Sequence, residues 1–237
     1  MPRRIIVFVV LAVVMAAVFV RLGIWQLRRL GERRARNALV SAWLQQPERP
    51  FAQVSRDSAP SHRKAFLQGT PDTANEFLVT GRSRNGSPGV HIITPVRVPG
   101  SDSAVLVNRG WVYAPDAATI DVSRWRERRS AFHGYTLLVP YTETPMVKGR
   151  GTREFSVAAA HALVPYPVSD VYLLAQDSGA VDSIPARLVL PPLDDGPHLN
   201  YAIQWFSFAA IAIAGAVIVA RRSRVHSDHV AQTAARH

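Results

Sequence analysis

Residues 201–220 read YAIQWFSFAAIAIAGAVIVA and contain no charged side chain. An uncharged run of about 20 residues is long enough to cross a bilayer as a helix. A second apolar run, Ile5–Val20, lies near the other end of the chain, and it continues past Arg21 because a long arginine side chain can reach the membrane surface. The sequence therefore predicts two transmembrane helices around a water-exposed middle.

The first run has a second interpretation, as a cleaved signal peptide with Arg3 and Arg4 before its apolar core. Trp25 favours a retained helix, because tryptophan is common at the membrane surface. The expected organisation is a cytoplasmic start (1–4), a first span (5–27), an extracytoplasmic domain (28–200), a second span (201–220) and a basic cytoplasmic tail (221–237).

Basic residues at the membrane edges give the orientation. Arg221, Arg222 and Arg224 follow the second span, and positive charge is typical of the cytoplasmic side. The basic residues between 28 and 36 oppose this orientation, but the charge rule weakens for long translocated loops. We expect both termini in the cytoplasm and the main domain on the external side of the membrane.

The net charge of +11 does not indicate nucleic-acid binding, because residues 28–200 hold 21 basic and 16 acidic side chains and much of the excess flanks the apolar runs. Basic flanks favour contact with membrane lipid. The chain has no cysteine, which excludes disulfides, thiolate metal sites and covalent heme attachment through C-x-x-C.

The middle of the chain has the signals of an α+β fold, with a mostly antiparallel sheet and a few short helices. A helix should continue from the membrane over Leu27–Leu44, and polar residues 55–73 read as loop. Strands are expected at 77–84, 90–98, 104–111, 135–141, 171–176 and 187–190, a short helix or irregular crossing at 115–125, and a helix at 157–163.

Enzyme signatures are absent: the sequence has no G-x-S-x-G, P-loop, G-x-G-x-x-G or H-E-x-x-H motif. We therefore do not expect an enzyme. Asp194 and Asp195 read as a solvated turn before the second span. His226 and His229 lie in the polar tail, where a weak metal contact is the alternative to a disordered segment.

His198 stands out because of its helical neighbours. In a helix beginning near Pro197, His198, Tyr201, Trp205 and Phe208 fall within about 80° of one another. A neutral imidazole beside aromatic rings suits an iron porphyrin, which needs an axial nitrogen and apolar contact. The alternative is an aromatic belt at the membrane surface.

The segment Asn108-Arg109-Gly110-Trp111 offers a second candidate. Arginine binds carboxylates through two hydrogen bonds, so Arg109, with Trp111, is a candidate contact for a heme propionate or a partner. A strand-end turn with a surface arginine is the alternative.

Four segments together resemble the surfeit locus protein 1 family of cytochrome c oxidase assembly factors. They are, in order, Gly23–Arg29, Gly89–Pro95, Val105–Val112 and Gly196–Phe206.

The resemblance implies two membrane spans, a domain facing the periplasm or the mitochondrial intermembrane space, and a role in maturing the heme centres of oxidase subunit I. We expect a bacterial inner membrane, with the main domain on the periplasmic side. The resemblance also implies His198 as the ligand of heme a iron, with Tyr201 and Gly89 at family positions. The chain departs from the family in residues 55–73, and it has arginines where a lysine usually follows the first segment.

The leading hypothesis is a non-enzymatic assembly factor that binds heme a through His198, with Tyr201 and Trp205 as the ring wall. Its expected partners are oxidase subunit I, other oxidase assembly factors and membrane lipid, but not nucleic acid. A scaffold that binds no heme is the first alternative. A copper chaperone is disfavoured, because copper(I) prefers sulfur ligands and the chain has no cysteine and three methionines.

Overall fold

The computed structural model describes residues 2–176 and 184–234, with side chains described as far as residue 223. It divides into two compact units, which we describe separately. The first is Met1–Leu39 with Pro192–His237, and the second is Val40–Pro191.

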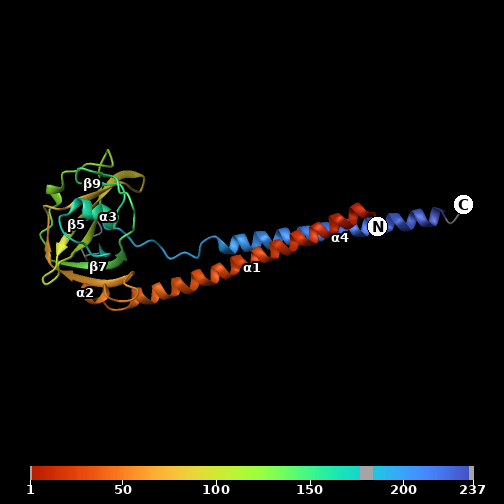
Figure 1. Cartoon of the computed structure of the whole chain (residues 1–237), viewed down its shortest axis with the longest axis horizontal. Helices are drawn as coiled ribbons and strands as arrows, with labels where there is room; N and C mark the ends of the chain where they lie inside the picture. Colours follow the sequence, from red (N-terminus) through yellow and green to blue (C-terminus); the bar gives the residue numbers. More distant parts are fainter. Residues whose placement is uncertain (1, 177–183, 235–237) are drawn as a thin grey trace. The chain divides into compact units, whose positions relative to one another are not determined.

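The first unit is a pair of antiparallel helices, α1 (Arg3–Gln45) and α4 (His198–Ala234), which lie side by side in Figure 1. Small residues recur every seventh position along the buried seam: Ala16 and Gly23 on α1, and Ala202, Ala209 and Ala216 on α4. A seven-residue repeat keeps one face of each helix turned towards its neighbour.

Gly23 allows the closest approach between the two helices. A Cβ atom built at this position would lie 2.7 Å from the ring of Phe206. Phe19, one turn earlier on α1, stacks on Trp205 with ring centroids 5.7 Å apart. The pair is therefore packed closely where the first and last motif segments meet.

Both helices are long and apolar enough to cross a membrane. The prediction of a helix continuing over Leu27–Leu44 is confirmed, because α1 is unbroken from Arg3 to Gln45. The second helix begins at His198, directly after Pro197, as proline at a helix start favours.

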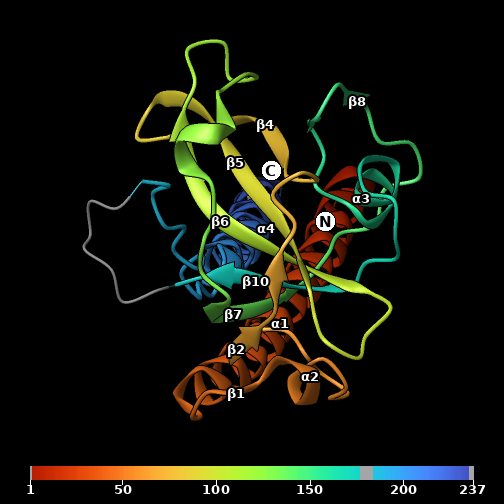
Figure 2. The same ribbon diagram turned by 90° about the vertical axis from the view of Figure 1, so that its left-hand side faces the viewer.

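The second unit is built on a sheet that has ten strands within the described residues (Figure 2). The strands are β1 Arg49–Pro50, β2 Arg63–Gln68, β3 Thr70–Pro71, β4 Phe77–Arg84, β5 Ser87–Arg97, β6 Ala104–Tyr113, β7 Ala131–Leu138, β8 Val147–Lys148, β9 Gly151–Thr152 and β10 Val171–Ala175. The short helices are α2 Phe51–Val54, the 3-10 helix η1 Val122–Trp125, and α3 Val157–Leu163.

Most neighbouring strands in the sheet are antiparallel. The hairpin β4–β5 turns at Asn85-Gly86 and is followed by the antiparallel pair β5–β6. β10 runs parallel to β6 and antiparallel to β7, and β7 pairs with β2. Because β3 follows β2 directly and pairs with β5, the sheet closes on itself.

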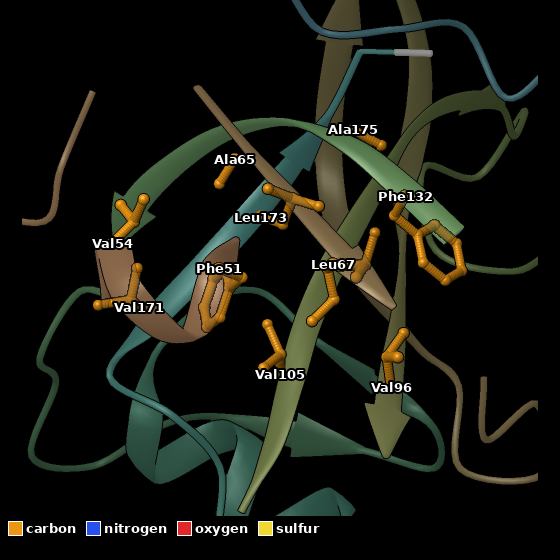
Figure 3. Close-up of a cluster of buried hydrophobic side chains, with 11 residues drawn as sticks. Phe51, Val54, Ala65, Leu67, Val96, Val105, Phe132, Val171, Leu173 and Ala175 are labelled. Atoms are coloured by element: carbon orange, nitrogen blue, oxygen red, sulfur yellow. The ribbon is translucent and has the colours of Figure 1, made fainter. Parts of the chain in front are cut away.

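The space inside the closed sheet is filled by a cluster of buried side chains (Figure 3). Figure 3 shows Leu67, Phe132 and Leu173 pointing towards Val96 and Val105 from different strands, with Phe51 of α2 beside them. A second cluster, around Phe77 and Leu163, packs α3 against β4. These two cores fix the strands that carry the middle motif segments.

The α+β prediction is confirmed, and so are the hairpin, the strand at β6 and the helix at α3. The loop expected over 55–73 is wrong, because β2 and β3 lie there. Ala65 and Leu67 are buried, whereas Phe66 and Gln68 are exposed and the strand starts with Arg63 and Lys64, so the strand is half buried and lacks a clear apolar pattern. The strand expected at 187–190 is absent, and only Ala186 forms a bridge, to Trp111.

Candidate functional site

The four motif segments gather in two places, one in each unit. In the helix pair, Gly23–Arg29 of α1 faces Gly196–Phe206 at the start of α4. In the closed sheet, Gly89–Pro95 and Val105–Val112 lie on the adjacent antiparallel strands β5 and β6. The contact between the first and last segments, which are far apart along the chain, was not predicted.

His198 is held by a glutamine of the first segment. Its Nδ1 lies 2.8 Å from Oε1 of Gln26, and Gln26 is itself buried. Since Oε1 of an amide is an acceptor, Nδ1 is the donor of this hydrogen bond, and in the neutral form of the ring the lone pair is then on Nε2. A hydrogen bond to the far nitrogen of an imidazole is the usual support of a metal-binding histidine.

The aromatic residues predicted beside His198 divide between two environments. Trp205 is half buried, and it contacts both Phe19 of α1 and Phe208 of its own helix. Tyr201 is 47% exposed and lies at the surface of α4. The ring of Trp205 is therefore already fixed by packing, whereas the ring of Tyr201 is still open to a ligand.

Asp194 and Asp195 tie the chain before α4 to α1. The backbone oxygen of Asp194 accepts hydrogen bonds from Arg33 and Asn37, and the carboxylate of Asp195 accepts one from Arg34 at 2.8 Å. This bond lowers the pKa of Asp195. The pair is therefore an anchor for the start of α4, rather than the freely solvated turn that the sequence suggested.

A small cavity of about 170 Å³ adjoins His198, lined also by Arg29, Glu32, Arg33 and Arg36 of α1. Its lining is mostly basic. Gln26 and these arginines were not predicted as site residues. The signal that pointed to them was the first motif segment and the unusual run of arginines after it.

Arg109 is buried in the closed sheet, where it forms the centre of a charge network. Its guanidinium donates to Oε1 of Glu76 at 2.7 Å, pairs with Oε2 of Glu127 at 3.2 Å and donates to the backbone oxygen of Trp125. Thr94 donates to the same Glu76 oxygen at 2.5 Å.

The network changes the acidity of both carboxyls. Burial raises the pKa of Glu76, although Thr94 and Arg109 oppose the rise. Burial also acts on Glu127, but hydrogen bonds from Arg129 prevail and lower its pKa to about 2. Arg109 thus neutralises carboxylates from two loops and is buried, so the alternative of a surface arginine is wrong, whereas its contact with a heme propionate or a partner stays a prediction.

Trp111 has a structural role in the closed sheet. A Cβ atom at Gly89 would collide with its indole ring, so the glycine is required by close approach across β5 and β6. The backbone of Trp111 exchanges two hydrogen bonds with Ala186. His91, opposite Trp111 on β5, has its pKa lowered to about 4 by burial and by Arg82.

A larger cavity, of about 1170 Å³, lies in the second unit beside β4 and the β8–β9 hairpin. Two polar side chains of its lining, those of Asp116 and Arg150, make other contacts. Asp116 binds Thr119, and Arg150 donates to backbone oxygens of Glu76 and Leu163. No polar groups of its lining converge on one point, so we assign it no role.

The described residues hold no group of three or more histidine, aspartate or glutamate side chains suited to a metal ion. A porphyrin iron has different needs, because the macrocycle supplies four nitrogens and the protein supplies an axial one. His198, with Nδ1 bound and Nε2 free, fits that single-ligand requirement.

The fold and site define a class of protein: a closed β-sheet unit joined to two helices capable of crossing a membrane, with a glutamine-bound histidine where the second helix begins. The chain belongs to the SURF1 family, whose model matches residues 13–210. It is 26% identical over 212 residues to a SURF1-like protein of Rickettsia felis, covering 86% of this chain and 92% of that protein. A SURF1-like protein of Rickettsia conorii is 24% identical over 213 residues, covering 86% and 88%.

Proposed function

We propose that this chain is a membrane-anchored assembly factor for cytochrome c oxidase, and that it binds heme a through His198 without acting as an enzyme. The observation that carries the proposal is the 2.8 Å hydrogen bond between Gln26 and Nδ1 of His198. It orients the ring and leaves Nε2 as the free nitrogen. Membership of the SURF1 family supports the link to oxidase assembly.

The residues around His198 suit a porphyrin in their chemistry. Tyr201 and Trp205 follow at helical spacing on the same side of α4 and offer flat apolar surface. Bound heme would supply an iron centre that accepts one protein nitrogen and is delivered to the oxidase. The chain's own residues would hold the group, orient it and shield one face from water.

The two helices support a location in a membrane. Basic residues after the second span favour a cytoplasmic C-terminal side, and in that orientation His198 would lie at the periplasmic surface of a bacterial inner membrane. The contacts between α1 and α4 support retention of the first span as an anchor. The partners would be oxidase subunit I and other assembly factors in the same membrane.

The test is the absorbance spectrum of the full-length protein purified in detergent from cells that make heme a. We expect a Soret band that is lost in His198→Ala and retained in His161→Ala, which changes an exposed histidine on α3. An unchanged band in His198→Ala would remove His198 as the ligand.

A second candidate function is a scaffold that binds subunit I without heme. The observation in its favour is the stacking of Trp205 on Phe19, which uses the ring to join the helices. Under this alternative the purified protein has no Soret band but co-purifies with subunit I, and His198→Ala reduces that co-purification.

A further inference from the structure

We propose that Arg29, Arg33 and Arg36 of α1 bind the propionate carboxylates of the heme that His198 ligates. This inference rests on the proposed function and adds a second set of contacts to the same site. It assigns to the helix pair the role that the sequence suggested for Arg109.

The three arginines share one face of α1 with the residue that holds His198. Counting from Gln26, they lie three, seven and ten positions further on, which places all four within about 80° around the helix. Arg29, Arg33 and Arg36 line the cavity beside His198. The imidazole and the guanidiniums therefore border the same small space.

The charge of this face favours carboxylates. Arg29 pairs with Glu32 and Arg33 pairs with Asp194 at 3.7 Å, so the three arginines and these two carboxylates leave an excess of one positive charge. Heme carries two propionates, and guanidinium binds carboxylate through paired hydrogen bonds. A cavity with an excess of positive charge is a favourable site for negative groups.

The arginines are free to make such contacts at low cost. Arg29 binds Glu32 at 2.9 Å, but both side chains are more than half exposed, so the pair is weak. The side chain of Arg36 makes no hydrogen bond or ion pair within the described part of the chain. Arg33 donates to the backbone oxygen of Asp194 and lies 3.7 Å from its carboxylate, in an exposed pair near the start of α4.

The size of the cavity suits carboxylates rather than a ring. Its volume of about 170 Å³ is that of a few water molecules at roughly 30 Å³ each. A porphyrin ring does not fit inside it, whereas the two carboxylates can displace water there. Arg109 lacks such space, because its guanidinium is already paired with Glu76 and Glu127.

The test compares hemin with hemin dimethyl ester, in which both carboxylates are blocked, by Soret titration of the full-length protein in neutral detergent. We expect the wild type to bind hemin about tenfold more tightly than the ester. Replacing the three arginines together (Arg29→Gln, Arg33→Gln and Arg36→Gln) should abolish this preference and leave ester binding unchanged.

The matched control is Arg28→Gln, which removes the same charge from a position that borders a different surface of α1, beside Trp25. It should keep the preference. If the triple variant does not fold, Arg36→Gln alone should reduce the preference about threefold, because Arg36 stabilises nothing else in the described structure.

The outcomes separate the two proposals. A His198-dependent Soret band with equal affinity for hemin and ester would overturn the arginine site and leave the proposed function standing. An equal effect of Arg28→Gln, or loss of the preference when phosphatidylglycerol is added, would identify the arginines as a general or lipid-binding surface and also overturn it. No His198-dependent band with either compound would overturn both.

Discussion

Replacing Arg109 with methionine should unfold the closed-sheet unit at much lower denaturant concentration. Arg109 is 4% exposed and contacts Glu76, Glu127 and the backbone of Trp125. Methionine fills much of the volume but leaves the Glu76 carboxyl buried without its cation. Removing one partner of a buried ion pair costs about 3 to 5 kcal/mol.

The loss of unfolding free energy in Arg109→Met should depend on pH, because Glu76 titrates. Burial raises the pKa of Glu76 above its unfolded value, so its ionised form opposes folding and stability falls as the pH rises through the folded pKa. Without Arg109 this pKa rises further. The difference between wild type and Arg109→Met should therefore be largest near neutral pH and smaller at about pH 5. Glu127 keeps its contacts with Arg129 and remains ionised.

The assay is urea unfolding of the full-length protein in mild detergent, followed by tryptophan fluorescence. Arg124→Met is the matched control, because its pair with Asp121 is exposed and should contribute less than about 1 kcal/mol. A loss in Arg109→Met as small as that of the control, or one independent of pH, would refute the account of Arg109 as the centre of a buried network.

Three further predictions concern the helix pair and the sheet. Gln26→Leu should weaken hemin binding about 10- to 100-fold in a Soret titration, because it removes the support of His198, whereas Gln204→Leu at an exposed position of α4 should not. Gly23→Val should weaken hemin binding in the same assay by pushing Phe206 away, and Gly31→Val, which meets no neighbour within 4 Å, should leave the affinity unchanged; equal effects would refute the close-packing argument. The pKa of His91 is about 4, below its unfolded value of 6.5, so the free energy of unfolding of the wild type falls as the pH drops from 6.5 towards 4. His91→Gln should remove about 2 kcal/mol of that loss, measured by urea unfolding at each pH. The same loss of stability at acid pH in the variant would contradict this prediction.

The sequence predicted the elements whose patterns are local. The uncharged run that ends at Ala220 and the long helix that continues past Leu27 follow from composition. The β4–β5 hairpin follows from its Asn-Gly turn. β2 escaped prediction because only Ala65 and Leu67 are buried, in a strand that also holds Arg63, Lys64 and Gln68. Whether a strand forms there is decided by β7, which lies far along the chain.

In the candidate site, too, local patterns could be predicted and contacts between distant residues could not. His198 and its aromatic neighbours were predicted because helical spacing relates them within one segment. Gln26 was not, because its contact with His198 joins residues 172 positions apart. The buried ion pairs of Arg109 were not predicted, because its two carboxylate partners come from distant loops and no local pattern indicates a buried ion pair.

The most direct test of the central claim is rescue of the histidine by free imidazole. His198→Gly should lose the Soret band of bound heme, because it removes the axial nitrogen, and imidazole added to the purified variant should restore the band at the wild-type wavelength. Loss of the band without rescue, in a variant that remains folded, would contradict ligation by His198. A band that persists in His198→Gly without imidazole would contradict it as well.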